Sequence, residues 1–393
     1  MAPLLSIDAA RTAVLDAVVA LGAEPVAVDG ALRRVLAEDV VAAHDVPPFD
    51  NSAMDGFALA AGPAGRELAV VGESRAGAPA VAAPGAAEAI RVSTGAVVPR
   101  GTEAVVPVEQ TSAADGRVTV EADVRPGQHI RRAGEDMRAG ERVLRSGTVL
   151  GPAELGVAVV AGRATVACAR RPRVALLVTG DELRAPGEPL GPGEIHESNG
   201  TTLAALAAQH GADVVLRARV ADTRADTERA IRDALDLADV LLLSGGVSVG
   251  PHDHVKPALA ANGVAERFWR VALRPGKPTW FGTAGDRLVF GLPGNPVSAM
   301  VTFLLFVRPA LAALQGADPR ARRVRARLAA PVERNPARDE AVRVRLDADG
   351  RATPTGPQGS HQLTSMLGGD GLALVTAGEG TAEAGSAVDV ELI

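Results

Sequence analysis

The chain has 393 residues, a length that favours roughly two to four domains over a single core. Its formal net charge is -6 with acidic and basic residues interspersed, which argues against a nucleic-acid binder. The single cysteine, Cys168, excludes an intrachain disulfide and a cysteine zinc cluster, and a packing role is expected for it. Because the sequence shows neither a basic leader nor an apolar run of about 18 residues, we expect a cytoplasmic protein without a membrane segment.

The first expected elements are helices. Ser6 is a suitable N-cap, and apolar residues from Ile7 to Leu21 recur at helical spacing before Gly22 ends the pattern. A second helix is expected over about residues 29–37. Both helices are interpreted as packing elements.

Residues 46–57, VPPFDNSAMDGF, interrupt this pattern because two prolines disfavour a helix and turn-forming residues crowd together. One interpretation is a polar loop between domains. The other is a loop that delivers the carboxylate of Asp55 to a site formed elsewhere in the protein. The pattern alone leaves both interpretations open.

A small β-rich domain is expected from about residue 58 to residue 140, where short apolar runs alternate with glycine and proline. The expected strands cover residues 68–71, 89–92, 104–108 and 118–120. Thr94 and Asp136 lie in turn-like segments of this region, and taken alone each is better explained by turn chemistry than by catalysis. A short helix then opens at Pro152.

Residues 173–309 alternate between strands and helices, and this order predicts a mostly parallel sheet with right-handed crossovers. The expected strands are 173–183, 213–222, 239–246 and the start of 287–307, and the expected helices are 201–211, 223–238 and the end of 287–307. In open α/β sheets, ligands bind outside the carboxyl ends of the strands. The loops that follow these strands are therefore the candidate site.

Several of these loops suit an anion. The buried strand at 241–243 runs directly into the glycine turn Ser244, Gly245 and Gly246, which offers backbone N–H groups. The segment GLPGNP leads into a helix N-terminus, where free N–H groups and the helix dipole favour anions. Fixed positive charge for an oxyanion would come from the side chains of Arg270, Arg274 and Lys277.

Three carboxylates, those of Glu182, Asp222 and Asp253, fall at or just after the ends of expected strands. They form either three helix caps or salt bridges, or one metal site if the strands are adjacent. His252 and His254 have the spacing of a metal pair, but the surrounding carboxylates favour Mg²⁺ over zinc. The coincidence with glycine turns and a cationic loop favours an Mg²⁺-dependent enzyme that acts on a phosphorylated or nucleotide ligand.

From about residue 325 the chain returns to short β-like runs at 341–346 and 373–377, separated by the polar loop GPQGSHQLTSM at 356–366. This pattern predicts a small C-terminal β domain. The chain holds no G-x-S-x-G elbow and no G-x-x-x-x-G-K-[ST] phosphate loop, so neither of these motifs explains its chemistry.

One ordered set of segments runs through the chain: PPFDNSAMDGFAL, RVSTGAVVPRGTEAVVPVE, GED at 134–136, TGDEL, GEIHESNG, SGGVSVGPHDHVK, LRPGKPTWFG, GLPGNPVS and GSHQLTSM. This set resembles the molybdopterin molybdenumtransferases, the MoeA family to which the gephyrin E domain also belongs. Each motif is weak alone, whereas the ordered set is specific and covers essentially the whole chain.

The resemblance implies a multidomain α/β architecture. A discontinuous helical domain I is expected at 1–48 and 141–172, interrupted by a β-rich inserted domain II at 49–140. A three-layer α/β domain III at 173–320, with a mostly parallel sheet, is expected to resemble the molybdopterin adenylyltransferases, and a small β domain IV to occupy 321–393. The family also implies an elongated homodimer with active sites between its subunits.

The implied reaction takes adenylated molybdopterin and molybdate, releases AMP and inserts molybdenum to give molybdenum cofactor. By motif match, the family's functional positions fall on Asp55, Thr94, Asp136, Glu182, Asp222, Asp253, Arg270, Arg274, Pro293 and Pro296. Asp222, Asp253 and Glu182 are assigned to Mg²⁺, whereas Arg274, Lys277 and Ser298 are expected to attract molybdate. The phosphate and AMP cradle is assigned to Ser244, Gly245, Gly246, Gly291, Pro293, Gly294, Asn295 and Pro296. The carboxylates of Asp55 and Asp136, with Thr94, would complete the pocket from the partner subunit.

Some relatives carry lysine where this chain has Arg270 and Arg274, so the donor geometry around an oxyanion differs. One alternative function is molybdopterin adenylyltransferase, for which domain III alone would suffice. Another is a gephyrin-like scaffold, although the sequence carries no extra linker or fused domain for that role. The expected partners are small-molecule substrates, a second copy, and possible contacts with molybdopterin adenylyltransferase and molybdoenzymes, without nucleic acid or membrane.

Overall fold

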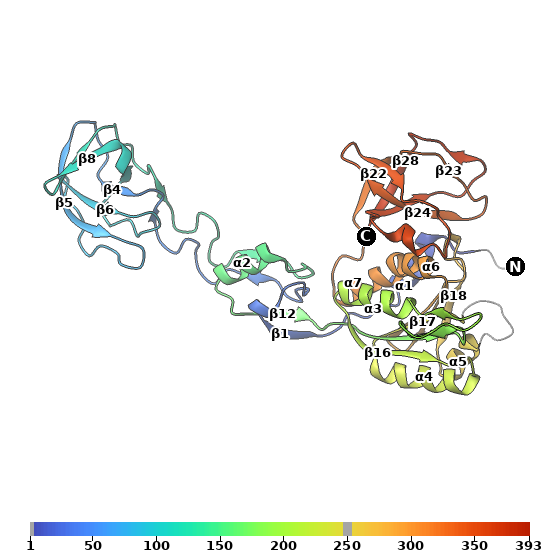
Figure 1. The fold of residues 1–393 in the computed structure, drawn as a ribbon. Helices are drawn as coiled ribbons and strands as arrows, with labels where there is room; N and C mark the ends of the chain where they lie inside the picture. The colour runs from blue at the N-terminus through green and yellow to red at the C-terminus, as the bar shows by residue number, and fades with distance from the viewer. Residues whose placement is uncertain (1–3, 247–253) are drawn as a thin grey trace.

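The computed structural model describes residues 4–246 and 254–393, so the predicted metal ligand Asp253 and the neighbouring His252 lie outside the described residues. The chain is elongated (Figure 1). A β-rich unit (51–131) lies at one end and is followed by a linking unit (23–41 and 142–169). At the other end, an α/β unit (173–314) lies beside a C-terminal β unit (323–392).

A six-stranded sheet in the order β16-β13-β17-β21-β20-β18 forms the centre of the α/β unit. Its strands are β13 (Arg173–Thr179), β16 (Asp213–Val220), β17 (Val240–Ser244), β18 (Ala265–Trp269), β20 (Trp280–Ala284) and β21 (Arg287–Leu292). The strands from β16 to β21 are parallel, whereas β20 and β18 continue the sheet antiparallel. The predicted mostly parallel sheet is confirmed. A separate small pair, β14 (Leu183–Arg184) and β15 (Ile195–His196), follows β13.

Helices cover both faces of this sheet (Figure 1). They are α3 (Asn199–Gln209), α4 (Arg224–Leu237), α5 (Val255–Ala261), α6 (Pro296–Thr302), the π-helical turn η3 (Phe303–Val307) and α7 (Arg308–Leu314). Along β13, Leu176 packs with α3 and α6 on one face, whereas Leu177 packs with α4 and α5 on the other. Burial on both faces explains why these strands appear in the sequence as continuous apolar runs.

The helix α1 (Ile7–Leu15) begins behind Ser6, whose Oγ accepts a hydrogen bond from the Ala9 N–H at 3.1 Å. The predicted N-cap is therefore confirmed, although the helix ends before Leu21. Its apolar face joins the core of the α/β unit through Ile7, Ala10 and Val14. This packing places α1 against the α/β unit, although the sequence suggested a place in an N-terminal domain; the domain boundaries themselves stay predictions.

The linking unit consists of short elements from two distant parts of the chain. They are β1 (Ala23–Ala27), η1 (Val28–Gly30), β2 (Val40–Val41), β11 (Arg142–Leu144), α2 (Pro152–Val160) and β12 (Thr165–Ala169). The helix expected over 29–37 is wrong, because the backbone N–H groups of Arg33, Leu36 and Ala37 bond to carbonyls at 148–150 and 167. Cys168 is fully buried in this unit's core, as expected for a packing residue.

The β-rich unit holds a six-stranded sheet in the order β7-β4-β6-β5-β9-β8. Its strands are β4 (Gly56–Leu59), β5 (Glu67–Ser74), β6 (Glu88–Val92), β7 (Ala104–Pro107), β8 (Thr111–Ala114) and β9 (Arg117–Val120), with η2 (Val108–Gln110) after β7. A small pair, β3 (Asn51–Ser52) and β10 (Ile130–Arg131), ties the two ends of the unit together. The expected strands of this region are confirmed as β5, β6, β7 and β9.

The C-terminal β unit is barrel-like, because β24 pairs with both β25 and β26 and closes the order β24-β25-β22-β28-β26. Its elements are β22 (Arg323–Leu328), β23 (Val332–Glu333), β24 (Asp339–Leu346), β25 (Arg351–Pro354), η4 (Leu363–Met366), β26 (Gly371–Val375), β27 (Thr381–Ala382) and β28 (Ala387–Leu392). The two-residue strand β19 (Leu273–Arg274) pairs with β24, so a loop of the α/β unit joins this unit.

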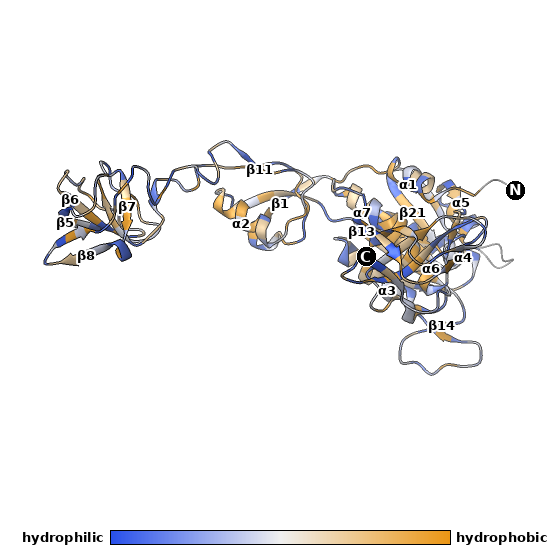
Figure 2. Ribbon diagram, turned by 90° about the horizontal axis from the view of Figure 1, so that it is seen from above, coloured by the Kyte–Doolittle hydropathy of each residue, from blue (hydrophilic) through white to orange (hydrophobic). Residues whose placement is uncertain are grey.

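Within the described residues, the segment Pro296–Leu314 is apolar and long enough to cross a membrane, with a mean hydropathy of 1.9. It comprises α6, η3 and α7, and 78% of it is buried inside the protein. Its side chains, among them Phe303 and Phe306, fill the core beneath the sheet. Figure 2 shows how strongly apolar residues gather in this unit. This segment is therefore a core helix of the α/β unit.

Candidate active site

A cleft of about 750 Å³ lies at the carboxyl ends of the parallel strands. Its walls come from the segments that follow β13, β16, β17 and β21, and from the start of α3. His361, from the C-terminal β unit, also lines it. The cleft therefore occupies the place at which open α/β sheets bind ligands, as the sequence predicted.

Many of the predicted site residues meet in this cleft. They are Glu182, Asp222, Ser244, Gly245, Gly246, Pro293, Gly294, Asn295 and Pro296. Gly245 and Gly246 adopt φ angles of 92° and 63°, which L side chains rarely adopt. A Cβ on Gly245 would lie 2.6 Å from the Thr179 carbonyl oxygen, and one on Gly246 would lie 2.5 Å from Val255 Cγ2. Glycine at both positions is thus required by space as well as by backbone conformation.

Other predicted residues of the α/β unit lie outside this lining. Gly291 is a buried residue within β21, and Ser298 is buried within α6. Arg274 is bound to Glu340 of the C-terminal β unit, and Lys277 is exposed. The guanidinium carbon of Arg270 lies 3.8 Å from the ring centroid of Trp269, close enough for a cation–π contact.

The predicted residues Asp55, Thr94 and Asp136 belong to the opposite end of the chain (Figure 1). Asp55 Oδ1 accepts a hydrogen bond of 2.7 Å from the Thr94 N–H, so the structure brings these two residues together. Asp136 follows β10, the last strand of the β-rich unit, and lines an open cavity of about 650 Å³. Within one chain, none of the three reaches the cleft.

The pKa of Asp222, on the acidic side of the cleft, is raised. Burial raises the pKa of the Asp222 carboxyl, and the neighbouring charges of Asp181 and Glu182 raise it further, whereas His254 opposes them. A cation would relieve this repulsion. Within residues 4–246 and 254–393, however, no three His, Cys, Asp or Glu side chains are grouped so that they could hold a metal ion.

Several residues of the cleft were not predicted as site residues, among them Asn199 and His361. Both lie in segments that the sequence marked, GEIHESNG and GSHQLTSM, but neither residue was assigned a role of its own. The loop that carries His361 reaches the cleft through Ser360. Its Oγ accepts from Asn295 Nδ2 at 2.9 Å, and its carbonyl accepts from the Val297 N–H at 3.2 Å. One N–H at the start of α6 is therefore already used by the protein.

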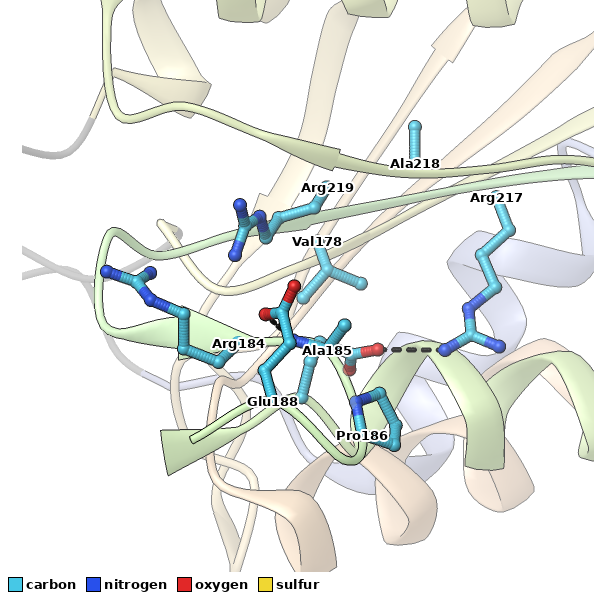
Figure 3. A pocket seen from close by; sticks show the side chains of 9 residues that line it. Val178, Arg184, Ala185, Pro186, Glu188, Arg217, Ala218 and Arg219 are labelled. Carbon is cyan, nitrogen blue, oxygen red and sulfur yellow. Dashed lines mark hydrogen bonds and ion pairs between the residues drawn. The ribbon is translucent and has the colours of Figure 1, made fainter. Parts of the chain in front are cut away.

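A second cavity of about 340 Å³ adjoins the cleft and shares Val178 and Glu197 with it. Figure 3 shows Arg184, Arg217 and Arg219 around it, with Glu188 between them. Arg217 is bound to Glu197 at 3.0 Å, Arg184 to Glu194, and Arg219 to the carbonyl of Leu183. Because each guanidinium already has a partner, we interpret this cavity as support for the neighbouring cleft.

These features define a class of protein: a multidomain α/β protein whose parallel sheet holds a cleft with glycine turns and carboxylates, suited to a phosphate-bearing ligand. Three family models match the chain. The model of the MoeA N-terminal region (domain I and II) matches residues 5–162, and that of the MoeA C-terminal region (domain IV) matches 325–393. Between them, a model described as "Probable molybdopterin binding domain" matches 175–313. The chain belongs to the MoeA family.

Curated relatives agree with this assignment. A protein of Haemophilus influenzae named molybdopterin molybdenumtransferase is 40% identical over 80% of this chain and 78% of its own length. Molybdopterin molybdenumtransferase 2 of Mycobacterium tuberculosis is 39% identical over 86% of this chain and 87% of its own. The molybdopterin molybdenumtransferase of Bacillus subtilis is 34% identical and covers 94% of this chain and 90% of its own length.

Solved structures are similar over the full chain. The molybdopterin biosynthesis MoeA protein of Pyrococcus horikoshii aligns with a TM-score of 0.86 at 29% identity, covering 99% of this chain and 100% of that one. A molybdenum cofactor biosynthesis protein of Pyrococcus furiosus aligns with a TM-score of 0.63 at 22% identity, which supports the fold alone. The elongated arrangement of units is therefore shared with solved relatives.

Proposed function

We propose that this protein inserts molybdenum from molybdate into adenylated molybdopterin, releasing AMP and forming molybdenum cofactor. The observation that carries the proposal is the cleft itself, where two glycine-containing turns and the carboxylates of Glu182 and Asp222 meet in a MoeA-family chain. Such a cleft suits a ligand that contains a phosphoanhydride, because backbone N–H groups hold phosphate oxygens while the acidic side recruits a cation. We expect the protein to act in the cytoplasm.

Different residues of the chain bind the two substrates. The turns at 244–246 and 293–295 hold and orient the phosphate groups of the adenylated substrate. The positive charges of Arg270, Arg274 and Lys277 attract the molybdate dianion to the neighbouring loop. Because Arg274 is paired with Glu340, it gives up part of that ion pair when it binds the anion. Ser298 supports this molybdate region from within α6.

Magnesium fits the acidic side of the cleft by its donor chemistry. Asp222 and Glu182 are oxygen donors, and the pKa of Asp222 is raised first by burial and then by like charges that a cation would neutralise. We propose that these residues hold Mg²⁺ together with Asp253, which lies outside the described residues. When bound, the ion would supply charge neutralisation at the phosphate oxygens.

A second copy of the chain is proposed to complete each site. Asp55, Thr94 and Asp136 belong to a part of the chain far from its own cleft, yet all three are exposed and accessible to the cleft of another copy. The linking unit between them also exposes apolar side chains around α2, a helix that Figure 2 colours as hydrophobic. They are Leu32, Val149, Val159 and Val160. Such a surface suits burial against a partner.

Complementation tests this homodimer directly. Asp55→Ala and Asp222→Ala variants are each expected to be inactive, because one lacks the donated carboxylate and the other lacks the cleft carboxylate. When the two variants are mixed after reversible dissociation, about half of the dimers that form are heterodimers, and each has one intact site of two. About a quarter of wild-type activity should therefore return. If heterodimers form but no activity returns, Asp55 and Asp222 either act in the site of the same chain or act outside the site.

A second assay separates the proposed reaction from adenylyl transfer. The wild-type protein is expected to release AMP from adenylated molybdopterin only when molybdate is present, and to leave ATP unconsumed when offered purified molybdopterin. Consumption of ATP in the second mixture would favour the adenylyltransferase alternative. A scaffold role would instead predict no turnover in either mixture.

A further inference from the structure

We propose that Asn199 is a positioning residue that sets the spacing of the two turns that hold the phosphate groups of the ligand. The inference rests on the proposed function, because it assigns those turns to phosphate binding. Asn199 lies in the segment GEIHESNG but is not among the predicted site residues, and the inference assigns it a role that can be measured separately from folding.

The amide of Asn199 joins three elements at the floor of the cleft. Asn199 is the first residue of α3 and is only 7% exposed. Its Nδ2 donates to Ser244 Oγ at 2.8 Å and to the Gly294 carbonyl at 2.7 Å. Ser244 ends β17 and Gly294 follows β21, so one side chain links both turns to the start of a helix.

The orientation of this amide follows from its partners. A backbone carbonyl only accepts hydrogen bonds, so the Gly294 oxygen must face Nδ2, and Oδ1 must point the other way. There, among the described residues, Oδ1 is buried without a hydrogen-bond partner. An unpaired buried acceptor costs about 1–3 kcal/mol. Asparagine at this position is therefore poorly explained by stability alone.

The start of α3 is itself held in place from the edge of the sheet. Glu197 Oε1 accepts from the Gly200 N–H at 2.6 Å, and its Oε2 accepts from Arg217 Nη2 at 3.0 Å. Arg217, on β16, also donates to Thr201 Oγ1 at 2.7 Å. One nitrogen of the guanidinium thus bonds to residues 197 and 201, which flank Asn199 in the sequence, and these bonds hold the start of α3 against β16.

The two turns are close enough for this link to matter. A Cβ placed on Gly294 would lie 3.7 Å from the Cα of Gly245, so the turns are nearly in van der Waals contact. Backbone N–H groups bind phosphate oxygens only within a narrow range of position. Loss of the Asn199 amide would leave the Gly294 carbonyl without this donor and would let the turns move apart.

The test compares Asn199→Ala with Asn262→Ala. Asn262 is a matched control because its Nδ2 also donates twice, to Glu228 O at 3.0 Å and Ala258 O at 2.8 Å, but at the end of α5 and outside the cleft lining. AMP affinity is measured by calorimetry on the full chain, and the thermal midpoint is measured without ligand. We expect Asn199→Ala to bind AMP about tenfold or more weakly, with a midpoint no lower than that of the control.

A third variant, Asn199→Asp, keeps the shape of the side chain but replaces the donor by an oxygen that faces the Gly294 carbonyl. It should bind AMP as weakly as the alanine variant. Wild-type affinity in either Asn199 variant, or a midpoint that falls well below that of Asn262→Ala together with the loss of affinity, would overturn the positioning role. If the wild-type protein itself bound no AMP, the proposed function would fail first, and the inference with it.

Discussion

Arg274 Nη1 lies 2.7 Å from Glu340 Oε1, and this ion pair joins the loop after β18 to the C-terminal β unit. The two residues also pair as neighbours in β19 and β24. The carboxylate is mostly buried, whereas the guanidinium is about half exposed. The cation expected to attract an oxyanion is therefore held, and partly neutralised, by a carboxylate of another unit.

Removing that carboxylate's charge should strengthen oxyanion binding. Glu340→Gln keeps a hydrogen-bond acceptor for Arg274 but removes one negative charge beside the proposed molybdate region. We expect the molybdate concentration for half-maximal AMP release to fall about fivefold, corresponding to roughly 1 kcal/mol. Glu333→Gln, at an exposed position of β23 in the same unit, serves as the control and should behave like the wild type. A higher molybdate requirement in Glu340→Gln would contradict a role for Arg274 in attracting the anion.

Glu391 on β28 should contribute strongly to the attachment of the C-terminal β unit. Its side chain is fully buried, and Arg11 of α1 and Arg323 of β22 each approach it to 2.7 Å. Arg308 of α7 lies 3.6 Å away. Glu391→Gln leaves these guanidinium groups without their counter-charge, so the free energy of unfolding should fall by about 3–5 kcal/mol.

The unfolding of these variants can be followed by the fluorescence of Trp269 and Trp280 in denaturant, since both tryptophans lie in the α/β unit that Glu391 contacts. Asp389→Asn is the control, because its ion pair with Arg325 is exposed and should be worth less than about 1 kcal/mol. Equal effects of the two substitutions would show that the buried cluster adds nothing beyond a surface ion pair.

Acid should destabilise the α/β unit through His210. Burial lowers the pKa of His210 to about 4, and the nearby charge of Arg308 contributes in the same direction. In the unfolded chain His210 has a pKa near 6.5, so it binds its proton at a higher pH than in the folded protein. The stability of the folded protein is therefore complete above pH 6.5 and is lost as the pH falls toward 4. His210→Gln should remove up to about 3 kcal/mol of this pH dependence. The exposed His44→Gln variant should follow the wild type; if both variants did so, the acid sensitivity would lie elsewhere.

The sequence predicted the α/β unit well because its strands are buried on both faces and end in glycine. The run in β17 is short, apolar and bounded by the turn at Gly245 and Gly246, a pattern typical of a buried strand. The error at residues 29–37 has a different origin. There the backbone bonds to segments more than 100 residues away, and a helical pattern in one segment does not reveal such pairing.

The candidate site was predictable only in part for the same reason. Glu182 and Asp222 each follow a strand, so the parallel sheet alone brings them to one edge. Asn199 and His361 reach the cleft through tertiary contacts with residues near 294 and 295, which lie more than 60 positions away. The distance of Asp55 and Thr94 from the cleft likewise depends on how whole units are arranged, which local sequence patterns do not encode.

The most direct test of the account measures AMP release from adenylated molybdopterin, with and without molybdate and Mg²⁺, by the wild type and by Asp222→Ala. Asp226→Ala, which removes a partly exposed carboxylate on the following helix, outside the cleft lining, is the matched control. We predict release that depends on molybdate and Mg²⁺ in the wild type and the control, and its loss in Asp222→Ala. Release that Asp222→Ala leaves intact would contradict the metal assignment. An absence of release by the wild type under every condition would contradict the proposed reaction.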